Sequence, residues 1–156
     1  MFAATQQTLA LRKTTSTTTT SRSSSLKVHM RAVKTGVKKS DLKDGKFVYE
    51  DDAKGRILLQ EFMGDVYAIN NKCPHLGLPL QGKTPLLSAT CSKRGGVVCP
   101  VHGSEFDLKT GEALGEWCPK VPTLPLVGKP MAGEPKNAEV YPVTIDESTG
   151  EIVLEL

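Results

Sequence analysis

The sequence has little of several residue types. It holds four cysteines and three histidines in 156 residues, and aromatic residues make up 5% of it. A small secreted disulfide scaffold carries more cysteines in a shorter chain, so the composition argues against that class. No stretch approaches the roughly 18 consecutive apolar residues of a membrane-spanning helix, so we expect no transmembrane helix. With so few aromatic rings, the core must rely on Val, Ile and Leu.

Acidic residues are absent from the first 40 positions, which hold eight Lys or Arg. The rest of the chain holds twelve basic and all seventeen acidic residues, so the part expected to fold has a net charge of −5. The clustered bases of a nucleic-acid-binding surface are missing, and we expect no nucleic-acid partner. A mildly acidic surface would suit a protein partner with a basic patch.

The acid-free leader predicts a targeting segment. It is rich in Ser and Thr, is spaced with Arg and Lys, and lacks the apolar stretch of about 7–15 residues of a secretory signal. We interpret residues 1–32 as a transit peptide cut after Ala32, residues 33–45 as a linker and residues 46–156 as one domain. The Ser and Thr content favours the chloroplast over the mitochondrion, and a merely disordered polar tail is the alternative.

Short β-prone runs separated by turn residues fill most of the remaining chain. The runs lie at 47–50, 56–62, 66–69 and 141–156. Met63-Gly64-Asp65 is a tight hairpin signal between two of them. Because no apolar period of 3.6 residues extends beyond two turns, the pattern indicates an all-β fold. Five of the ten prolines lie in residues 119–135, which excludes a helix or a central strand there.

Two short phrases, CPHLG at 73–77 and CPVHGS at 99–104, each combine one cysteine with one histidine. Thiolate and imidazole ligands suit zinc and iron–sulfur centres. A structural zinc site usually groups its ligands by type, as Cys-x₂₋₄-Cys and His-x₃₋₅-His, whereas each phrase here mixes the two. Two loops that approach from opposite sides can offer two thiolates to one iron and two imidazoles to a second. This is the Rieske arrangement, in which two histidines replace two cysteines on one iron of a [2Fe–2S] centre.

CPHLG followed by CPVHGSEFDLKTGE resembles the motif pair of the Rieske-type ferredoxins, over roughly residues 45–156. The resemblance implies a stack of small antiparallel sheets with both cluster-binding loops at one tip. It also implies that Cys73 and Cys99 hold the buried iron of a [2Fe–2S] cluster, while His75 and His102 hold the more exposed iron. Ser104 is expected to hydrogen-bond to the cluster. A mononuclear zinc site is the alternative.

Three neighbours of these ligands depart from the high-potential members of the family that the chain resembles. Those members carry a disulfide at the positions of Leu78 and Val101, and a Tyr that donates to a cysteine sulfur at the position of Phe106. Hydrogen bonds to cluster sulfur raise the reduction potential. Their loss predicts a low to intermediate potential within the Rieske span of about −150 to +300 mV.

Several conspicuous residues lie outside the motif pair. Cys91 and Cys118 could form a disulfide or supply a redox-active thiol, but two unpaired cysteines, at least one of them buried, are the favoured interpretation. Trp117 is expected to pack at the base of the loops, with a place in an electron path as the alternative. Residues 119–135 are expected to cover the cluster base, with a partner-binding surface as the alternative. His29 lies in the leader and is not expected to be a ligand.

The resemblance favours a soluble one-electron carrier whose partner is another redox protein: a reductase, an oxygenase or a photosynthetic complex. GLPLQGKTPLL, DLKTGEALGEWCPK and PLVGKP resemble plastid Rieske-like proteins associated with thylakoids and photosystem II. The alternative is therefore an organising or redox-sensing protein with peripheral thylakoid association. A Rieske oxygenase would need a further iron held by two histidines and a carboxylate, and only His29 is left over, so we expect no catalytic residues.

Overall fold

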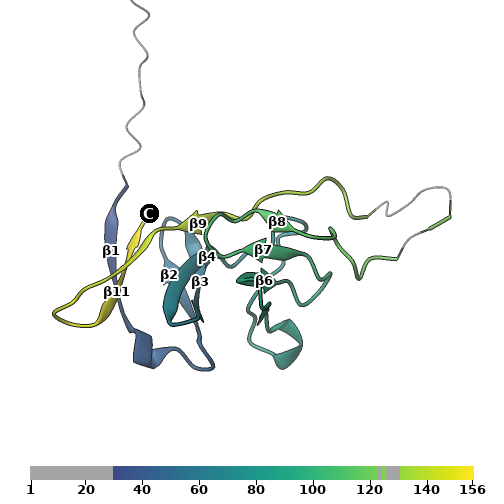
Figure 1. The fold of residues 1–156 in the computed structure, drawn as a ribbon. Helices are drawn as coiled ribbons and strands as arrows, with labels where there is room; N and C mark the ends of the chain where they lie inside the picture. Colours follow the sequence, from purple (N-terminus) through teal and green to yellow (C-terminus); the bar gives the residue numbers. More distant parts are fainter. Residues whose placement is uncertain (1–29, 123, 126–130) are drawn as a thin grey trace, which may run out of the picture.

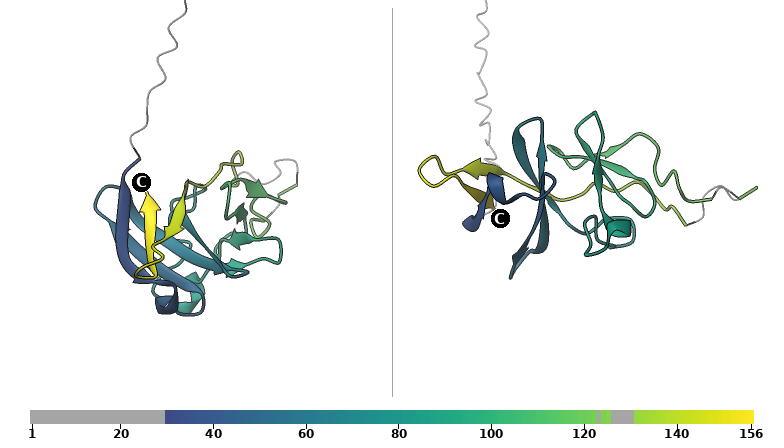
Figure 2. Two further views of the ribbon diagram at one scale, coloured as in Figure 1. Left: turned by 60° about the vertical axis from the view of Figure 1, so that its left-hand side comes forward. Right: turned by 90° about the horizontal axis from the view of Figure 1, so that it is seen from below.

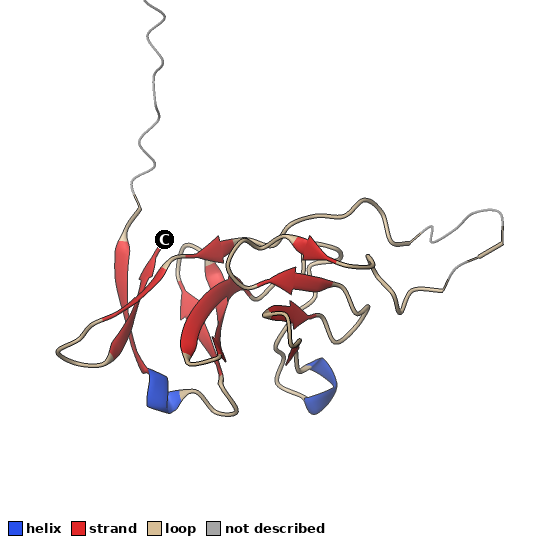
Figure 3. Cartoon of the chain, viewed as in Figure 1, coloured by secondary structure: helices blue, strands red, loops and turns tan. Residues whose placement is uncertain are grey.

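Eleven strands form the fold of the described residues. The protein is described from a computed structural model that covers residues 30–122, 124–125 and 131–156. The strands are β1 (Ala32–Lys38), β2 (Lys46–Asp51), β3 (Gly55–Phe62), β4 (Asp65–Asn70), β5 (Thr90–Cys91), β6 (Gly96–Val98), β7 (Glu105–Asp107), β8 (Ala113–Leu114), β9 (Val140–Tyr141), β10 (Val143–Ile145) and β11 (Glu151–Glu155). Two single 3₁₀ turns, Lys39–Asp41 and Pro85–Leu87, are the only helical elements of the described residues (Figure 3). None of these elements could span a bilayer as a helix.

The strands form three small antiparallel sheets with the orders β1-β11-β10, β2-β3-β4-β9 and β5-β6-β7-β8. The sheets follow one another along the long axis of the molecule, with β2-β3-β4-β9 in the middle (Figures 1 and 2). The expected all-β stack of small antiparallel sheets is confirmed. The turn between β3 and β4 is the two-residue loop Met63-Gly64, and both residues have the positive φ of 51° and 95° that such hairpins favour.

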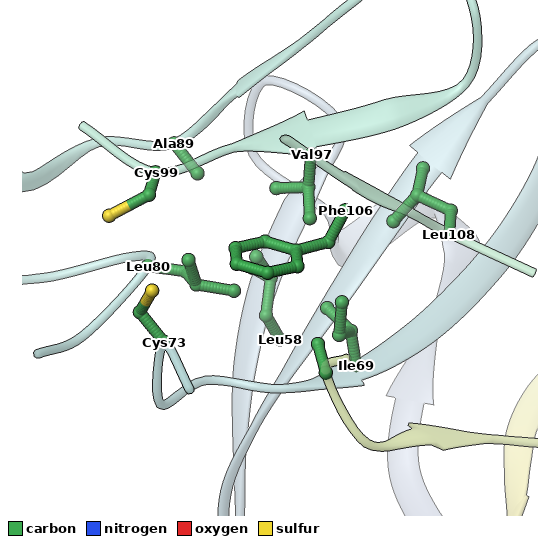
Figure 4. Close-up of a cluster of buried hydrophobic side chains, with 10 residues drawn as sticks. Leu58, Ile69, Cys73, Leu80, Ala89, Val97, Cys99, Phe106 and Leu108 are labelled. Carbon is green, nitrogen blue, oxygen red and sulfur yellow. The ribbon is translucent and has the colours of Figure 1, made fainter. Parts of the chain in front are cut away.

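The middle sheet is buried on both faces. Leu58 packs into one core cluster, while its neighbours Ile57 and Leu59 pack into the other, because successive side chains of a strand point to opposite faces. The first cluster lies between the middle sheet and the β5-β6-β7-β8 sheet, and it includes Cys73 and Cys99 (Figure 4). The second joins the middle sheet to the β1-β11-β10 sheet. β3 thus contributes side chains to both core clusters.

The segment 33–45 differs from the expected linker. Ala32–Lys38 forms β1, which pairs with β11, and Val37 is buried in the second core cluster. Arg31 extends this pairing, since its backbone N–H donates to Leu156 O at 2.8 Å and its backbone O accepts from Leu156 N at 2.9 Å. The strand pattern is weak here because only Val33 and Val37 are apolar on the inner face, with Thr35 between them, while Lys34, Gly36 and Lys38 alternate with them. The rest of the predicted transit peptide, residues 1–29, lies outside the described residues.

Candidate metal centre

The two Cys/His phrases form loops with the same backbone hydrogen bonds. In the first loop, Cys73 N donates to Leu78 O and Gly77 N donates to Cys73 O, both at 2.8 Å. In the second, the N–H of Cys99 donates to Ser104 O at 2.8 Å and Gly103 N donates back to Cys99 O at 3.0 Å. Each loop therefore closes five residues after its cysteine. The first follows β4, the second joins β6 to β7, and both lie at one tip of the fold (Figure 1).

The loops bring both predicted thiol ligands to one edge of the first core cluster (Figure 4). Cys73 and Cys99 are fully buried and, with His102, form a group whose ligand atoms lie within 4.8 Å of one another. Cys73 Sγ lies 3.0 Å from His102 Nε2. Two buried thiols beside an imidazole are a donor set that a metal centre would satisfy.

His75 lies next to this group, with its ring centroid 4.4 Å from that of His102. Its Nε2–H donates to Met131 O at 2.7 Å, because a carbonyl oxygen can only accept, and so Nδ1 carries the lone pair. Such a bond from the second ring nitrogen to a backbone carbonyl is typical of metal-ligating histidines. His75 is partly exposed, whereas His102 is only 3% exposed, so of the two histidines predicted to hold the more exposed iron, His75 is the one that solvent reaches.

Burial and mutual contact tune the protonation of these groups. A hydrogen bond with Cys99, together with burial, raises the pKa of Cys73, and the same bond lowers the pKa of Cys99 to about 6. The thiol pair thus gives up one proton readily and retains the second. Burial lowers the pKa of His102 to about 4, so its imidazole is neutral at pH 7. Thiolate and neutral imidazole are the forms that bind metal.

Ser104 lies at the histidine side of the site. Its Oγ lies 3.1 Å from His102 Nδ1, accepts a hydrogen bond from Cys118 N at 2.9 Å and donates to Cys118 Sγ at 3.4 Å. The structure therefore places the Ser104 hydroxyl within hydrogen-bonding distance of the ligand His102. The expected hydrogen bond from Ser104 to the cluster itself stays a prediction. This buried hydroxyl ties the second loop to the segment that follows β8.

Cys118 belongs to the site, although the sequence analysis left it outside. With His75 and His102 it forms a second group of ligand atoms within 4.8 Å, and its thiol is fully buried. Cys91 belongs to neither group of ligand atoms, and the structure shows no disulfide among the described cysteines. A signal was present in the sequence: Cys118-Pro119 is the third Cys-Pro pair, after those of the two ligand loops.

Trp117 and part of the proline-rich segment cover the histidines. The Trp117 ring centroid lies 5.7 Å from that of His75 and 6.3 Å from that of His102, and its Nε1 donates to Ala132 O at 2.7 Å. Trp117 therefore packs beside the imidazoles rather than at the loop base alone, and it also contacts Phe106 at 6.1 Å. The described part of 119–135 lies over the histidine side of the site through Met131 and Ala132.

The three positions that depart from the high-potential pattern fall into two groups. Leu78 and Val101 are 39% and 41% exposed at the tip of their loops. Phe106 is fully buried at the centre of the first core cluster, where it packs beneath the cysteines without a hydroxyl to donate to them (Figure 4). These three side chains provide neither a disulfide between the loops nor a hydroxyl donor to cluster sulfur. The low to intermediate reduction potential that we expect for this reason stays a prediction.

Fold and site together define a metal-binding protein of the iron–sulfur class, since two matching loops bring thiols and imidazoles to one tip of a small β stack. The profile of the Rieske [2Fe–2S] domain matches residues 33–126, and the chain belongs to this family. Its cofactor is accordingly a [2Fe–2S] cluster, and the donor set at the tip fits that group.

Individual proteins resemble this chain over different lengths. Apoptosis-inducing factor 3 of Mus musculus is 36% identical over 72 residues, which are 46% of this chain and 11% of that protein. The ferredoxin of carbazole 1,9a-dioxygenase from Nocardioides aromaticivorans IC177 has a TM-score of 0.56 at 21% identity, covering 79% of this chain and 95% of the ferredoxin. A chain in the complex of reduced oxygenase and oxidized ferredoxin in carbazole 1,9a-dioxygenase has a TM-score of 0.56 at 18% identity, with 80% and 92% covered. At these identities the structural likeness concerns the fold.

Proposed function

We propose that this chain is a one-electron carrier whose [2Fe–2S] cluster is held by Cys73 and Cys99 on one iron and by His75 and His102 on the other. The observation that carries the proposal is the pair of loops with the same hydrogen bonds, which bring two buried thiols and two imidazoles to one tip. When bound, the cluster supplies reversible one-electron chemistry. The chain's own residues position it, keep water from its thiolate side and leave one imidazole edge near the surface.

The composition of the site favours a carrier over an oxygenase. Within the described part of the chain, the groups of three or more metal-ligating side chains are the two that share His102. A second, mononuclear iron site with its own histidines and carboxylate has no counterpart among these residues. A carrier passes electrons to another protein, so the surface around His75 is the expected docking face.

That surface is rich in exposed apolar side chains, and the part of the chain that contains the ligand loops carries a small basic excess. Among the exposed large apolar residues, five lie in the ligand loops and the covering segment: Leu76, Leu78, Val101, Leu124 and Met131. The described residues between 71 and 136 include seven Lys or Arg and five Asp or Glu, whereas the other described residues include eight and twelve. Because the acidic excess lies away from the cluster tip, the partner we propose is a redox protein with an acidic docking face. The mildly acidic charge of the whole folded part would suit a basic patch on a partner only if the acidic residues were spread evenly over the surface.

The test is reconstitution of the protein with iron and sulfide, followed by visible and paramagnetic spectra of the oxidised and reduced forms. We expect two irons per chain and a reversible Rieske signal. Cys99→Ser and His102→Cys should abolish or change the signal, while the control Cys91→Ser should leave it intact. A native spectrum in either ligand variant would contradict the ligand assignment, and one zinc per chain in place of iron would contradict the cluster.

The location of the carrier is a second part of the proposal. We propose that residues 1–32 direct the chain to the chloroplast, where it is a stromal or thylakoid-associated carrier; the composition of this leader supports the proposal. A fluorescent fusion of the full chain should co-localise with plastids, and a fusion that begins at Met30 should not. Mitochondrial signal from the full-length fusion would refute the plastid address without affecting the cluster assignment.

A further inference from the structure

The histidine side of the site holds one more ligand-capable atom than a Rieske cluster needs. A [2Fe–2S] cluster takes four protein ligands, two on each iron. The structure gathers five at this tip: the four predicted ligands and Cys118. Cys118 Sγ lies 3.5 Å from His75 Nδ1 and 3.6 Å from His102 Nδ1, so it faces the same ring nitrogen of both histidines.

These two separations match those of ligands on one tetrahedral metal. Metal–sulfur bonds of about 2.3 Å and metal–nitrogen bonds of about 2.05 Å, at the tetrahedral angle, put sulfur and nitrogen about 3.6 Å apart. The thiol therefore lies where a ligand of the iron bound by His75 and His102 would lie, and not merely near the site.

The Cys118 thiol is fixed at this place by contacts with the second ligand loop. Its backbone N–H donates to Ser104 Oγ at 2.9 Å. Two residues on, Lys120 N donates to His102 O at 3.1 Å and Lys120 Nζ donates to Pro100 O at 2.9 Å. Because both sides of Cys118 are tied to residues 100–104, the thiol stays beside the histidines when either imidazole moves.

We propose that Cys118 is a reserve ligand of the histidine-bound iron, which replaces His75 when that imidazole leaves. The proposal rests on the cluster assignment made above. With His75 in place, Cys118 would stand beside the two imidazoles. Without His75, the cluster would be held by three cysteines and one histidine (Cys73, Cys99, Cys118 and His102). Cys118 would bind through its sulfur, its thiol proton would pass to solvent, and the electron count of the cluster would not change.

His75 is the imidazole that we expect Cys118 to replace. It is partly exposed, and its Nε2 is held by a single hydrogen bond to Met131 O in the covering segment. His102 is 3% exposed and contacts both Cys73 Sγ and Ser104 Oγ. The outer histidine thus has the fewer constraints, and it is the one that solvent can reach.

The experiment compares His75→Ala, His75→Ala/Cys118→Ser and His75→Ala/Cys91→Ser with the wild-type chain, all reconstituted in the same way. We expect His75→Ala and the Cys91 control to keep about two irons per chain, with a paramagnetic spectrum altered from wild type. The Cys118 double variant should lose at least half of its iron. In His75→Ala itself, the thiolate-to-iron absorption should rise and the reduction potential should fall, because an anionic thiolate replaces a neutral imidazole.

Three results would overturn the reserve-ligand proposal. One is loss of the cluster in His75→Ala to the same degree as in the Cys118 double variant. Another is retention of the cluster in both variants. The third is a His75→Ala cluster whose thiolate-to-iron absorption does not rise. This measurement uses the single variant alone, so it tests the proposal even if the double variant does not fold. A wild-type chain that shows no Rieske signal would instead contradict the proposed function, so the two failures are distinguishable.

Discussion

The Ser104 side chain contacts both a predicted cluster ligand and the backbone of a neighbouring segment. Its hydroxyl lies between the ring of His102 and the backbone of Cys118, and it is 1% exposed. A buried hydroxyl with two such partners holds a ligand in place and also satisfies an N–H that would otherwise lack a partner. Asp51 has a comparable structural role at the other end of the molecule.

For Ser104→Ala, we expect the free energy of unfolding to fall by about 1–3 kcal/mol, because the buried Cys118 N–H loses its acceptor. The reduction potential should also fall, since a donor near the cluster is removed. Denaturant unfolding and protein-film voltammetry measure the two effects. Ser88→Ala, in the loop before β5, is the control and should leave the potential unchanged.

Asp51 makes the stability depend on acid. Hydrogen bonds from Lys54 N and Ala53 N, with the Arg31 guanidinium 3.0 Å away, hold the pKa of Asp51 below its usual range. A lowered folded-state pKa contributes stability that is present above the unfolded value of about 3.9 and is lost as pH falls through the folded value.

We therefore compare the wild type with Asp51→Asn, in the same cluster state, between pH 7 and pH 3. The wild type should be more stable by about 1 kcal/mol at pH 7, and this difference should shrink below about pH 4. A difference that stays constant over the whole range would show that the charge of Asp51 contributes nothing.

At the scale of elements, the two ligand loops are alike in backbone but unlike in surroundings. Gly77 and Gly103 have positive φ values of 71° and 81°, the left-handed conformation that glycine adopts without strain. A Cβ on Gly77 would meet nothing within 4 Å, whereas one on Gly103 would lie 2.9 Å from Pro119 Cγ. The second loop is thus packed against the Cys118 segment, while the first is open.

This contrast gives a matched pair of variants. Gly77→Ala should cost about 1–2 kcal/mol of stability through backbone strain alone. Gly103→Ala should cost more, and it should also change the cluster's paramagnetic spectrum by displacing Pro119 and its neighbour Cys118. Equal stabilities and equal spectra for the two variants would argue that the contact between the second loop and this segment is unimportant.

At the scale of the whole molecule, charge is separated along the long axis. The sheets far from the ligand loops carry the acidic excess, and the part with the loops carries the basic one. Lys72 precedes the first ligand loop, and Lys136 lines, together with Glu134, a hollow that also includes His75. This distribution favours approach of a negatively charged redox partner to the cluster tip.

The reduced protein should accordingly transfer electrons faster to an anionic metal complex than to a cationic complex of equal driving force, with the difference decreasing as salt rises. Lys72→Glu together with Lys136→Glu should lower the rate with the anionic complex by about tenfold at low salt. Lys38→Glu, in β1 at the opposite end, is the control. Stopped-flow kinetics measures these electron-transfer rates. An equal decrease in rate for Lys38→Glu would contradict electrostatic attraction of the partner to the cluster tip.

Three features can be read from the amino-acid sequence alone: the all-β class, the hairpin at Met63-Gly64, and the mixed phrases CPHLG and CPVHGS that identify the family. These features are local: period-two apolar runs, turn residues and ligand spacing are each readable within a few neighbouring residues. The family's cofactor follows from the same short motifs, because their residue types and spacing limit the metal chemistry.

Other features of the site and the fold arise only from contacts between segments that are distant in the sequence. Only folding brings Cys118 to His75 and His102, since 43 residues separate Cys118 from His75 and no local pattern records their contact. Only pairing with β11 makes a strand of the lysine-rich segment Ala32–Lys38. The uneven burial of the two histidines likewise comes from packing, because His102 lies against the buried Cys73 Sγ and Ser104 Oγ, whereas His75 reaches only the covering segment through Met131 O. Contacts between distant segments depend on how the sheets pack, and single-residue preferences do not encode that packing.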